Sequence, residues 1–269
     1  MSGARNIGAL TRVYSDVTWR VYEELDRSLG PRGPDWLFEL AGRYLHPGAV
    51  IMDAGCRDAG HLIRLVTEHG ATGVGVEPVA VHAEWARAAV RDAGLAERID
   101  IRHTTMDATG QPDGSVDLIW CRDVLPQVDP LVPALRGLAR ALRPGGHLIV
   151  HTTVTTALLR PDDAAMLARH MGVVPANLSE DTLTAGFTAS GLAVAERDEI
   201  GSEWREHAEE RHRPASTALL RLARLRRRRE AIAAEHGEDV YRHVEANLHW
   251  DVLQLLGRLS QVVYVLRAA

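Results

Sequence analysis

The chain has 269 residues, of which 46 % are hydrophobic and 25 % charged, values typical of a folded globular protein with a sizeable core. Every one of the 31 basic residues is arginine, which excludes a lysine nucleophile, a Schiff base and a P-loop lysine. The net charge of −5 gives no general attraction to nucleic acid, and we interpret the basic run Arg226–Arg229 as a solvated helix face, with a nucleic-acid or membrane surface as the alternative.

Cysteine content and hydropathy indicate the compartment. Cys56 and Cys121 fall at the expected ends of adjacent strands, which is a poor disulfide framework and favours a reduced, intracellular protein. The first residues lack an apolar core of signal-peptide length, and no apolar stretch reaches the length of about 18 residues that a membrane span needs. We therefore expect a soluble cytoplasmic protein with no membrane partner.

The first half of the chain alternates between helical and strand patterns. Helices are predicted at 17–26 and 35–44, separated by a Gly-Pro-Arg-Gly-Pro turn. Beyond them the predicted strands are 49–53, 73–77, 99–103, 115–121 and 147–153, and the predicted helices are 61–69, 79–93 and 131–142. Strands and helices in alternation predict a doubly wound α/β fold, in which a parallel sheet carries helices on both faces.

After Thr155 the pattern becomes mostly helical. Helices are predicted at 162–170 and 180–190, and strands at 192–200 and 261–266. Between these two strands the residues from Ser202 to Gly257 form a long helical insertion, which we interpret as a cap on the same domain.

Three features at expected strand ends indicate a nucleoside cofactor. The first strand ends in an acid, Asp53, and the loop Asp53–Gly60 that follows contains a glycine-bearing turn and leads into a helix. Glu77 ends the second strand and can accept hydrogen bonds from both ribose hydroxyls. Met106 and Asp107 follow the third strand and can flank a base. A dinucleotide fits less well, because G-x-G-x-x-G is absent and Arg57 occupies the approach.

These motifs, in this order, resemble those of the class I S-adenosylmethionine-dependent methyltransferases, in particular actinobacterial small-molecule enzymes with a D-x-G-C-R-D-G loop. The resemblance covers roughly residues 45–267. The matching segments are Asp53–Asp58, Gly75–Pro78, Asp117–Val124, Leu142–Gly146, Ser202–Glu206 and Leu256–Leu266.

The resemblance implies the fold, the cofactor and its binding residues. The fold is expected to be a Rossmann-like, seven-stranded sheet with an antiparallel last strand, preceded by an N-terminal helical lid at 1–47 and completed by a domain at 48–269 whose cap spans about 201–258. S-adenosylmethionine would contact eight residues, namely Asp53, Gly55, Cys56, Glu77, Met106, Asp107, Cys121 and Arg122.

The sequence departs from the family pattern at two places. The loop D-x-G-x-G-x-G keeps its first glycine, whereas Arg57 and Ala59 stand at the other two positions. Relatives usually carry Glu-His-Val after Asp-Val-Leu, but this chain has Pro126-Gln127-Val128, so a histidine that could act as general base is missing. Some methyltransferases work mainly by proximity and in-line orientation.

The substrate is expected beyond the methyl position, under the cap. Asp123 and His151 are the candidate catalytic residues, because both follow strands at the ligand end. The candidate substrate-binding residues are Tyr14, Tyr22, Gln127, Glu203, Trp204 and Glu206. Two alternatives stay open: Glu203 and Glu206 either bind an amine or pair with Arg205 and Arg211 on the surface, and Trp204 either contacts substrate or packs in the core.

The sequence leaves three hypotheses about function. The first is methyl transfer from S-adenosylmethionine to N or O of a small molecule, as in secondary-metabolite biosynthesis. The second is a methyltransferase homologue that closes a ring by intramolecular displacement without methylating. The third is a non-catalytic subunit that binds a small partner protein or a second copy of itself. No metal is expected, because the chain lacks H-E-x-x-H and C-x-x-C spacings.

Overall fold

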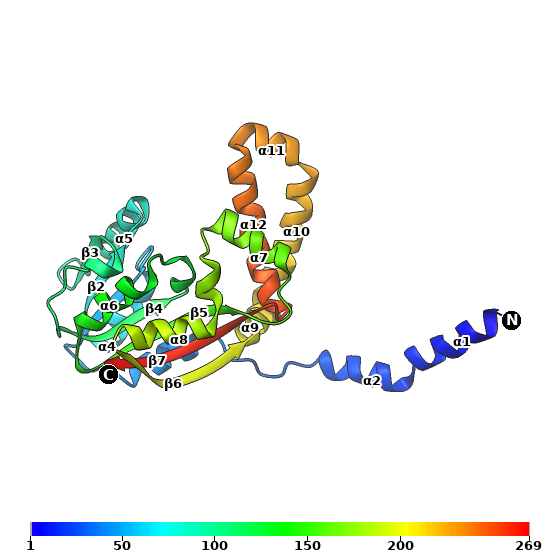
Figure 1. Ribbon diagram of the computed structural model, residues 1–269, viewed down its shortest axis with the longest axis horizontal. Coiled ribbons are helices and arrows are strands. Elements are labelled where there is room, and N and C mark those ends of the chain that lie inside the picture. Colours follow the sequence, from blue (N-terminus) through cyan, green and yellow to red (C-terminus); the bar gives the residue numbers. More distant parts are fainter. Residues whose placement is uncertain (1, 269) are drawn as a thin grey trace.

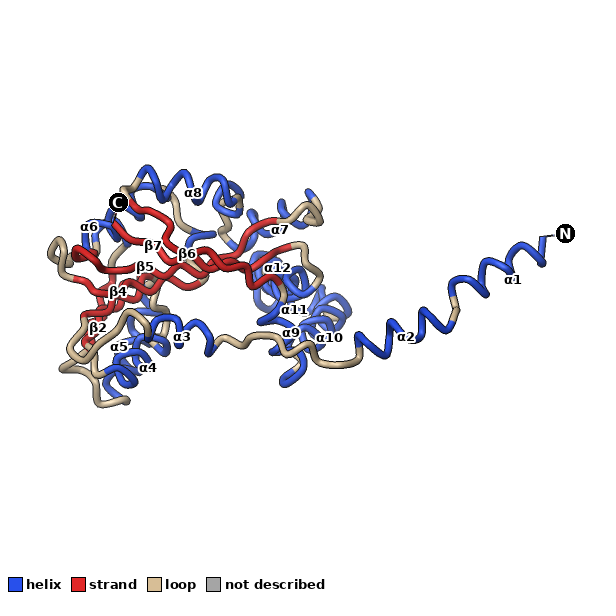
Figure 2. Tube along the Cα trace, turned by 90° about the horizontal axis from the view of Figure 1, so that it is seen from below, coloured by secondary structure: helices blue, strands red, loops and turns tan. Residues whose placement is uncertain are grey.

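A seven-stranded sheet organises the protein (Figures 1 and 2), which is represented by a computed structural model that describes residues 2–268. The strand order is β3-β2-β1-β4-β5-β7-β6. The strands are β1 (Val50–Ala54), β2 (Thr72–Glu77), β3 (Ile99–His103), β4 (Val116–Arg122), β5 (Leu142–Thr155), β6 (Leu192–Gly201) and β7 (Leu259–Ala268). β7 runs antiparallel to both neighbours, whereas β1 to β5 pair in parallel, so the predicted Rossmann-like sheet with an antiparallel last strand is confirmed.

Helices cover both faces of the sheet, because alternate residues of the buried strands point to opposite sides. On β4, Leu118 and Trp120 belong to one core and Ile119 and Cys121 to the other. The first core is covered by α3 (Asp35–Gly42), α4 (Gly60–His69) and α5 (Ala80–Asp92), and the second by α6 (Leu131–Ala141) and α8 (Glu180–Ala189). Figure 2 shows these two helical layers below and above the strands.

The predicted insertion between β6 and β7 is helical throughout. It comprises α9 (Glu203–His212), α10 (Pro214–Arg227), α11 (Arg229–His236) and α12 (Glu238–Leu255), and its outer part projects from the body in Figure 1. The lower part of α12 packs on α7 (Pro161–Met171) and β7 in a third, smaller core that contains Leu167, Trp250, Leu253 and Leu259. This packing places one face of α12 above the carboxyl ends of the strands.

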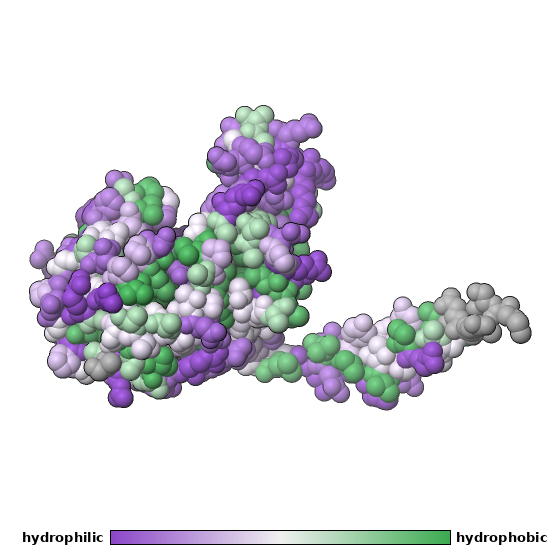
Figure 3. All heavy atoms as spheres, viewed as in Figure 1, coloured by the Kyte–Doolittle hydropathy of each residue, from purple (hydrophilic) through white to green (hydrophobic). Residues whose placement is uncertain are grey.

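The N-terminal segment differs from the expected lid. α1 (Ser2–Val13), which the sequence pattern did not predict, and α2 (Asp16–Leu25) extend away from the body in Figure 1, and between residues 7 and 25 apolar side chains are exposed to solvent (Figure 3). Tyr14 and Tyr22 are 63 % and 56 % exposed. α3, by contrast, lies in the first core through Leu37 and Phe38. Neither tyrosine lines the cleft in this arrangement, and the lid at 1–47 stays a prediction.

One strand boundary also moves, for a structural reason. β5 begins at Leu142 rather than at His147, since Leu142 already pairs with Val116 before the Pro144-Gly145-Gly146 segment shifts the register. Within the part of the chain that the structure describes, no helix combines the length and apolarity of a membrane span.

Candidate active site

A cleft of about 1070 Å³ opens at the carboxyl ends of β1, β2 and β4, where open α/β sheets bind ligands. Its floor and first wall come from the loops after these strands, and its second wall comes from α9 and α12. Of the predicted site residues, those that line it are Gly55, Cys56, Glu77, Met106, Asp107, Arg122, Asp123 and Gln127. The sequence thus located one side of the cleft well.

The loop after β1 turns through three left-handed residues. Gly55 has φ +84°, Arg57 +48° and Ala59 +60°. These are the three positions at which the D-x-G-x-G-x-G pattern has glycine, so the loop keeps the glycine conformation with two side chains present. Position 55, unlike positions 57 and 59, has no room for a side chain, because a Cβ there would lie 2.6 Å from Cγ2 of Val124. Left-handed backbone at a residue with a Cβ costs roughly 1–2 kcal/mol, which the surrounding packing must offset.

Glu77 holds this loop at the end of β2. Its side chain is buried, and its Oε2 accepts the Arg57 amide N–H at 2.8 Å while Oε1 accepts the Val79 amide N–H at 3.0 Å. Each carboxylate oxygen can accept a further hydrogen bond. Glu77 therefore lines the cleft as an oriented acceptor, with the geometry that two vicinal hydroxyls would use.

Two predicted residues lie behind the cleft wall rather than on it. Asp53 is buried, and its burial, followed by the nearby charge of Glu77, raises its pKa to about 8. Cys121 points into the second core and is 1 % exposed, so it does not line the cleft as expected. Cys56 does line it, but burial and then the charge of Asp53 raise the pKa of its thiol far above the usual range, which disfavours a thiolate.

A short helical turn, η1 (Met106–Ala108), supplies the base-side wall after β3. Met106 is buried and Asp107 is exposed. The sequence analysis missed the residue that allows this approach, Gly137 of α6, where a Cβ would come within 2.1 Å of the Met106 carbonyl oxygen. A glycine in the middle of an otherwise Leu- and Ala-rich helix is the signal that could have indicated such a close contact.

At the other end of the loop, Arg122 and His61 form a basic corner. Nη1 of Arg122 lies 2.6 Å from Nε2 of His61, and the guanidinium lies 5.5 Å from the Trp204 ring. Burial, reinforced by the charge of Arg122, lowers the pKa of His61 to about 4, so its neutral ring can accept the hydrogen bond. Arg122 thus presents a positive charge to the cleft beside the loop of β1.

Asp123 follows β4 in a left-handed conformation, with φ +59°. It lies deep in the cleft with its side chain open to the cavity, and Oδ1 accepts a hydrogen bond from Thr153 Oγ1 at 3.1 Å. Desolvation raises its pKa, and the Thr153 hydrogen bond together with the positive charges of Arg205 and Arg122 opposes that rise. Asp123 is therefore a carboxylate whose affinity for a proton is raised, facing open space.

The cap contributes four side chains to the wall opposite the strand ends. Nη1 of Arg205 pairs with Oδ1 of Asp251 at 2.8 Å, and Asn247 and Trp250 complete this wall. Asn247, Trp250 and Asp251 are three and four residues apart on α12 and share one helix face. That spacing was readable in the sequence, but which face of the helix meets the cleft depends on the tertiary packing.

His151 does not line the cleft. It is 1 % exposed and stacks on the buried Trp204 with ring centroids 4.5 Å apart, and neither ring nitrogen has a hydrogen-bond partner among the described residues. Burial, followed by the positive charges of Arg122 and Arg205, lowers the pKa of His151 well below its usual value. The prediction that His151 accepts a proton from substrate is not supported by this position, and Trp204 is a packing residue.

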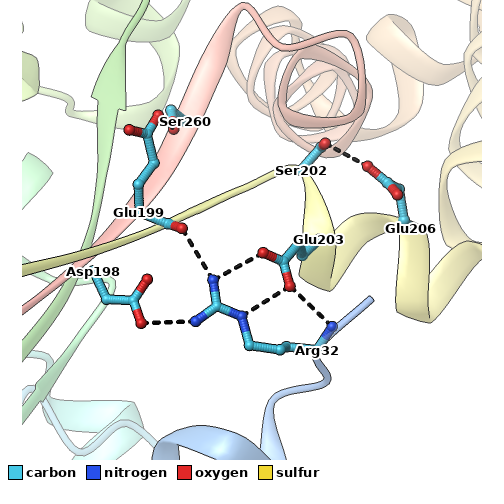
Figure 4. Close-up of polar contacts among 7 residues, drawn as sticks. All are labelled: Arg32, Asp198, Glu199, Ser202, Glu203, Glu206 and Ser260. Carbon is cyan, nitrogen blue, oxygen red and sulfur yellow. Dashed lines mark hydrogen bonds and ion pairs between the residues drawn. The ribbon is translucent and has the colours of Figure 1, made fainter. Parts of the chain in front are cut away.

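Glu203 and Glu206 do not line the cleft, and Figure 4 shows Glu203 pointing toward Arg32. Both carboxylate oxygens of Glu203 bind the Arg32 guanidinium at 2.8 Å, and Glu206 accepts a hydrogen bond from Ser202 at 2.5 Å. Arg32 also pairs with Asp198 at 2.7 Å. Glu203 therefore anchors the segment before α3 to α9, and neither glutamate makes the expected pairs with Arg205 and Arg211.

The sequence from β1 to β5 matches a known family. Residues 52–150 match the family described as "Methyltransferase domain". This part of the chain is similar to class I S-adenosylmethionine-dependent methyltransferases. The chain is 29 % identical over 162 residues to the methyltransferase GfsG of Streptomyces halstedii, a match that covers 60 % of this chain and 50 % of that protein. It is 26 % identical over 181 residues to the 27-O-demethylrifamycin SV methyltransferase of Amycolatopsis mediterranei, covering 63 % and 65 %.

Solved structures agree with this methyltransferase fold. A sarcosine dimethylglycine methyltransferase homologue from Galdieria sulphuraria superposes with a TM-score of 0.67 at 20 % identity, covering 87 % of this chain and 84 % of that one. The [4+2]-cyclase SpnF superposes with a TM-score of 0.66 at 19 % identity, covering 87 % and 80 %. At these identities the likeness concerns the fold alone.

The residues of the cleft fit the cofactor of this methyltransferase family, S-adenosylmethionine. Glu77 offers free lone pairs at the end of β2, and Gly55, which packs against Val124, lines the cleft without a side chain. Arg122 lines the cleft next to His61, which follows the loop after β1, and offers a positive charge there. Among residues 2–268, no cluster of three or more His, Cys, Asp or Glu side chains has the arrangement of a metal site.

Proposed function

We propose that the protein transfers a methyl group from S-adenosylmethionine to a nitrogen or oxygen of a small molecule, as a tailoring step in natural-product biosynthesis. The observation that carries this proposal is the pairing of Glu77 with the left-handed loop after β1, in a cleft that Asp123 also lines with an exposed side chain. Glu77 would bind the ribose hydroxyls, Met106 and Asp107 would border the adenine, and Arg122 would bind the carboxylate of the methionine end.

The chemistry divides between the cofactor and Asp123. When bound, S-adenosylmethionine supplies an electrophilic methyl group on a sulfonium. The cleft holds the acceptor between Asp123 and the cap, so that its nucleophile approaches in line. Oδ1 of Asp123 is occupied by Thr153, which leaves Oδ2 to receive the proton that the nucleophile loses. Its raised pKa makes Asp123 a stronger proton acceptor than a free aspartate, and it would serve where relatives have the histidine that Gln127 replaces.

Calorimetric titration tests the cofactor assignment. The wild-type protein should bind S-adenosylmethionine or S-adenosylhomocysteine, and Glu77→Gln should weaken that affinity about 30-fold, the usual loss for a charged hydrogen-bond acceptor. Glu84→Gln, on the exposed side of α5, is the matched control and should bind like the wild type. Absence of binding by the wild type at millimolar ligand would contradict the proposal.

A second candidate function is intramolecular displacement that closes a ring, because Gln127 stands in place of the usual histidine and the same fold occurs in a [4+2]-cyclase. Product mass separates the two, since methylation adds one CH₂ group and ring closure by displacement removes a leaving group. A pocket that binds neither ligand, in a protein that co-purifies with a stable partner, would instead favour a non-catalytic subunit.

A further inference from the structure

A buried chain of hydrogen bonds runs from the cap to Asp123. Gln254 of α12 is 0 % exposed, and its Nε2 donates to Thr153 Oγ1 at 3.0 Å. Thr153 Oγ1 in turn donates to Oδ1 of Asp123 at 3.1 Å. On its other side, Oε1 of Gln254 accepts a hydrogen bond from Nε of Arg205 and a weaker one from Gln261 Nε2 at 3.3 Å. Four elements of the fold, α9, α12, β5 and the end of β4, meet in this chain.

The direction of every bond in the chain follows from Arg205. A guanidinium has only donors, so the group of Gln254 that faces Arg205 must be its carbonyl oxygen. The amide NH₂ of Gln254 must then face Thr153, and because that NH₂ also only donates, the Thr153 oxygen accepts. The single hydroxyl proton of Thr153 is left with one acceptor, Asp123. The direction of the Thr153–Asp123 hydrogen bond is therefore set by Arg205, which acts through Gln254.

We propose that Gln254 is a positioning residue that directs the Thr153 hydroxyl proton onto Asp123 and so keeps Asp123 in its ionised, proton-accepting form. The proposal rests on the assignment of Asp123 as the proton acceptor in the proposed methyl transfer. The cap helix α12 then does more than enclose the substrate. Through Gln254, which does not line the cleft, it controls the protonation of the Asp123 carboxylate.

The Asp123 titration can be followed directly, without a known substrate, by carboxyl carbon NMR of protein labelled at aspartate. The resonance of Asp123 is the one that disappears in Asp123→Asn. Thr153→Val removes the donor, and the midpoint of the Asp123 titration should rise by about one pH unit, as expected for the loss of one hydrogen bond to a charged group. Thr153→Ser keeps the hydroxyl and should restore the wild-type midpoint.

Gln254→Glu tests the orientation itself. A carboxylate at this position keeps the partners Arg205 and Gln261 but cannot donate, so Thr153 turns its proton toward Glu and Asp123 loses its donor. The Asp123 midpoint should again rise. Because a new negative charge also raises it, the substitution is repeated in the Thr153→Val background, where the rise should be smaller if Thr153 transmits the effect.

Thr152→Val is the matched control, since Thr152 is the neighbouring residue of β5, equally buried, and its hydroxyl has no hydrogen-bond partner among the described residues. In the Thr152→Val variant, the midpoint of the Asp123 titration should equal that of the wild type. An unchanged midpoint in Thr153→Val, or in Thr153→Ala should the valine variant fail to fold, would overturn the proposal. Full methyl-transfer activity in Asp123→Asn would instead overturn the catalytic assignment while leaving the titration result intact.

Discussion

The two walls of the cleft are built by different means. The cofactor-side wall is built by the loop after β1, of which residues 55–58 line the cleft, and this loop has three left-handed residues and is held by one buried carboxylate, Glu77. The cap-side wall is assembled from side chains of β5, α9 and α12 that meet Asp123 at the end of β4. One wall is a local conformation, whereas the other is a long-range network.

This difference predicts how each wall responds to substitution. In the cofactor-side wall, an added or removed Cβ changes backbone strain and close packing, with effects confined to the loop. In the cap-side wall, removing one side chain leaves a partner without its charge or hydrogen bond, so the effect spreads along the network. The following substitutions separate the two behaviours, in decreasing order of expected effect.

Asp53 should give the largest effect, through pH. Its pKa is raised to about 8 in the folded protein from a usual value of 3.8, so the folded state binds the proton more tightly than the unfolded state. The protein should therefore lose stability as the pH rises toward 8, and Asp53→Asn should remove that loss. Between pH 6 and pH 9, the variant should gain about 3 kcal/mol in free energy of unfolding relative to the wild type.

Urea unfolding at several pH values measures this difference. Asp92→Asn, at an exposed position at the end of α5, is the control and should follow the wild-type pH dependence. Parallel curves for the wild type and Asp53→Asn would show that the charge of Glu77 and the burial of Asp53 do not act on this carboxyl as described.

Gly55→Ala tests close packing in the same wall. Both Gly55 and Gly48 have φ near +80°, but a Cβ at Gly55 meets Val124 at 2.6 Å, whereas one at Gly48 meets nothing within 4 Å. The two alanine variants share the backbone strain, and Gly55→Ala should cost about 2 kcal/mol more than Gly48→Ala because of the clash. Thermal or urea unfolding of the pair checks this, and equal losses would mean that Val124 moves aside freely.

Arg205→Met tests the network of the cap-side wall. It leaves Asp251 without its ion pair and Gln254 without its strongest donor, and should cost about 1.5 kcal/mol in free energy of unfolding. Arg242→Met removes ion pairs with Glu238 and Glu245 on the outer part of α12 and should cost about 0.5 kcal/mol. If the two losses were equal, the cap-side network would be no stronger than a surface ion pair.

Ala59→Gly should have the smallest effect and the opposite sign. Ala59 begins α4 with φ +60°, so glycine relieves left-handed strain while adding some freedom to the unfolded chain. We expect a net gain of about 0.5 kcal/mol, measured by urea unfolding. Ala86→Gly, in the middle of α5, relieves no strain and only adds freedom to the unfolded chain, so its free energy of unfolding should fall by about 1 kcal/mol. A loss at Ala59 as well would indicate that its methyl group stabilises the loop through packing.

The same contrast explains what could be predicted from the sequence. The alternation of strands and helices and the position of the cofactor-side wall follow from local signals, because Gly55 and Glu77 lie where hydrophobic runs end. Gln254 and Thr153 gave no such signal, since their meeting depends on how a helix more than 100 residues along the chain packs onto β5. His151 was misplaced because the sequence located the strand end but not the face that Trp204 covers.

The placement of the N-terminal segment could not be predicted for a related reason. The helical spacing at 17–26 predicted α2, but spacing cannot say against which surface the apolar side of a helix lies. Arg32 fixes where this segment leaves the body, through Glu203 and Asp198. Those glutamate and aspartate partners stand more than 160 residues later in the chain.

The most direct test of the central claim is a crystal structure with S-adenosylhomocysteine bound. The account predicts that both ribose hydroxyls lie within hydrogen-bonding distance of Glu77, that the carboxylate meets Arg122, and that the sulfur faces Asp123 across the cleft. A ligand bound elsewhere, or one whose sulfur points away from Asp123, would contradict it.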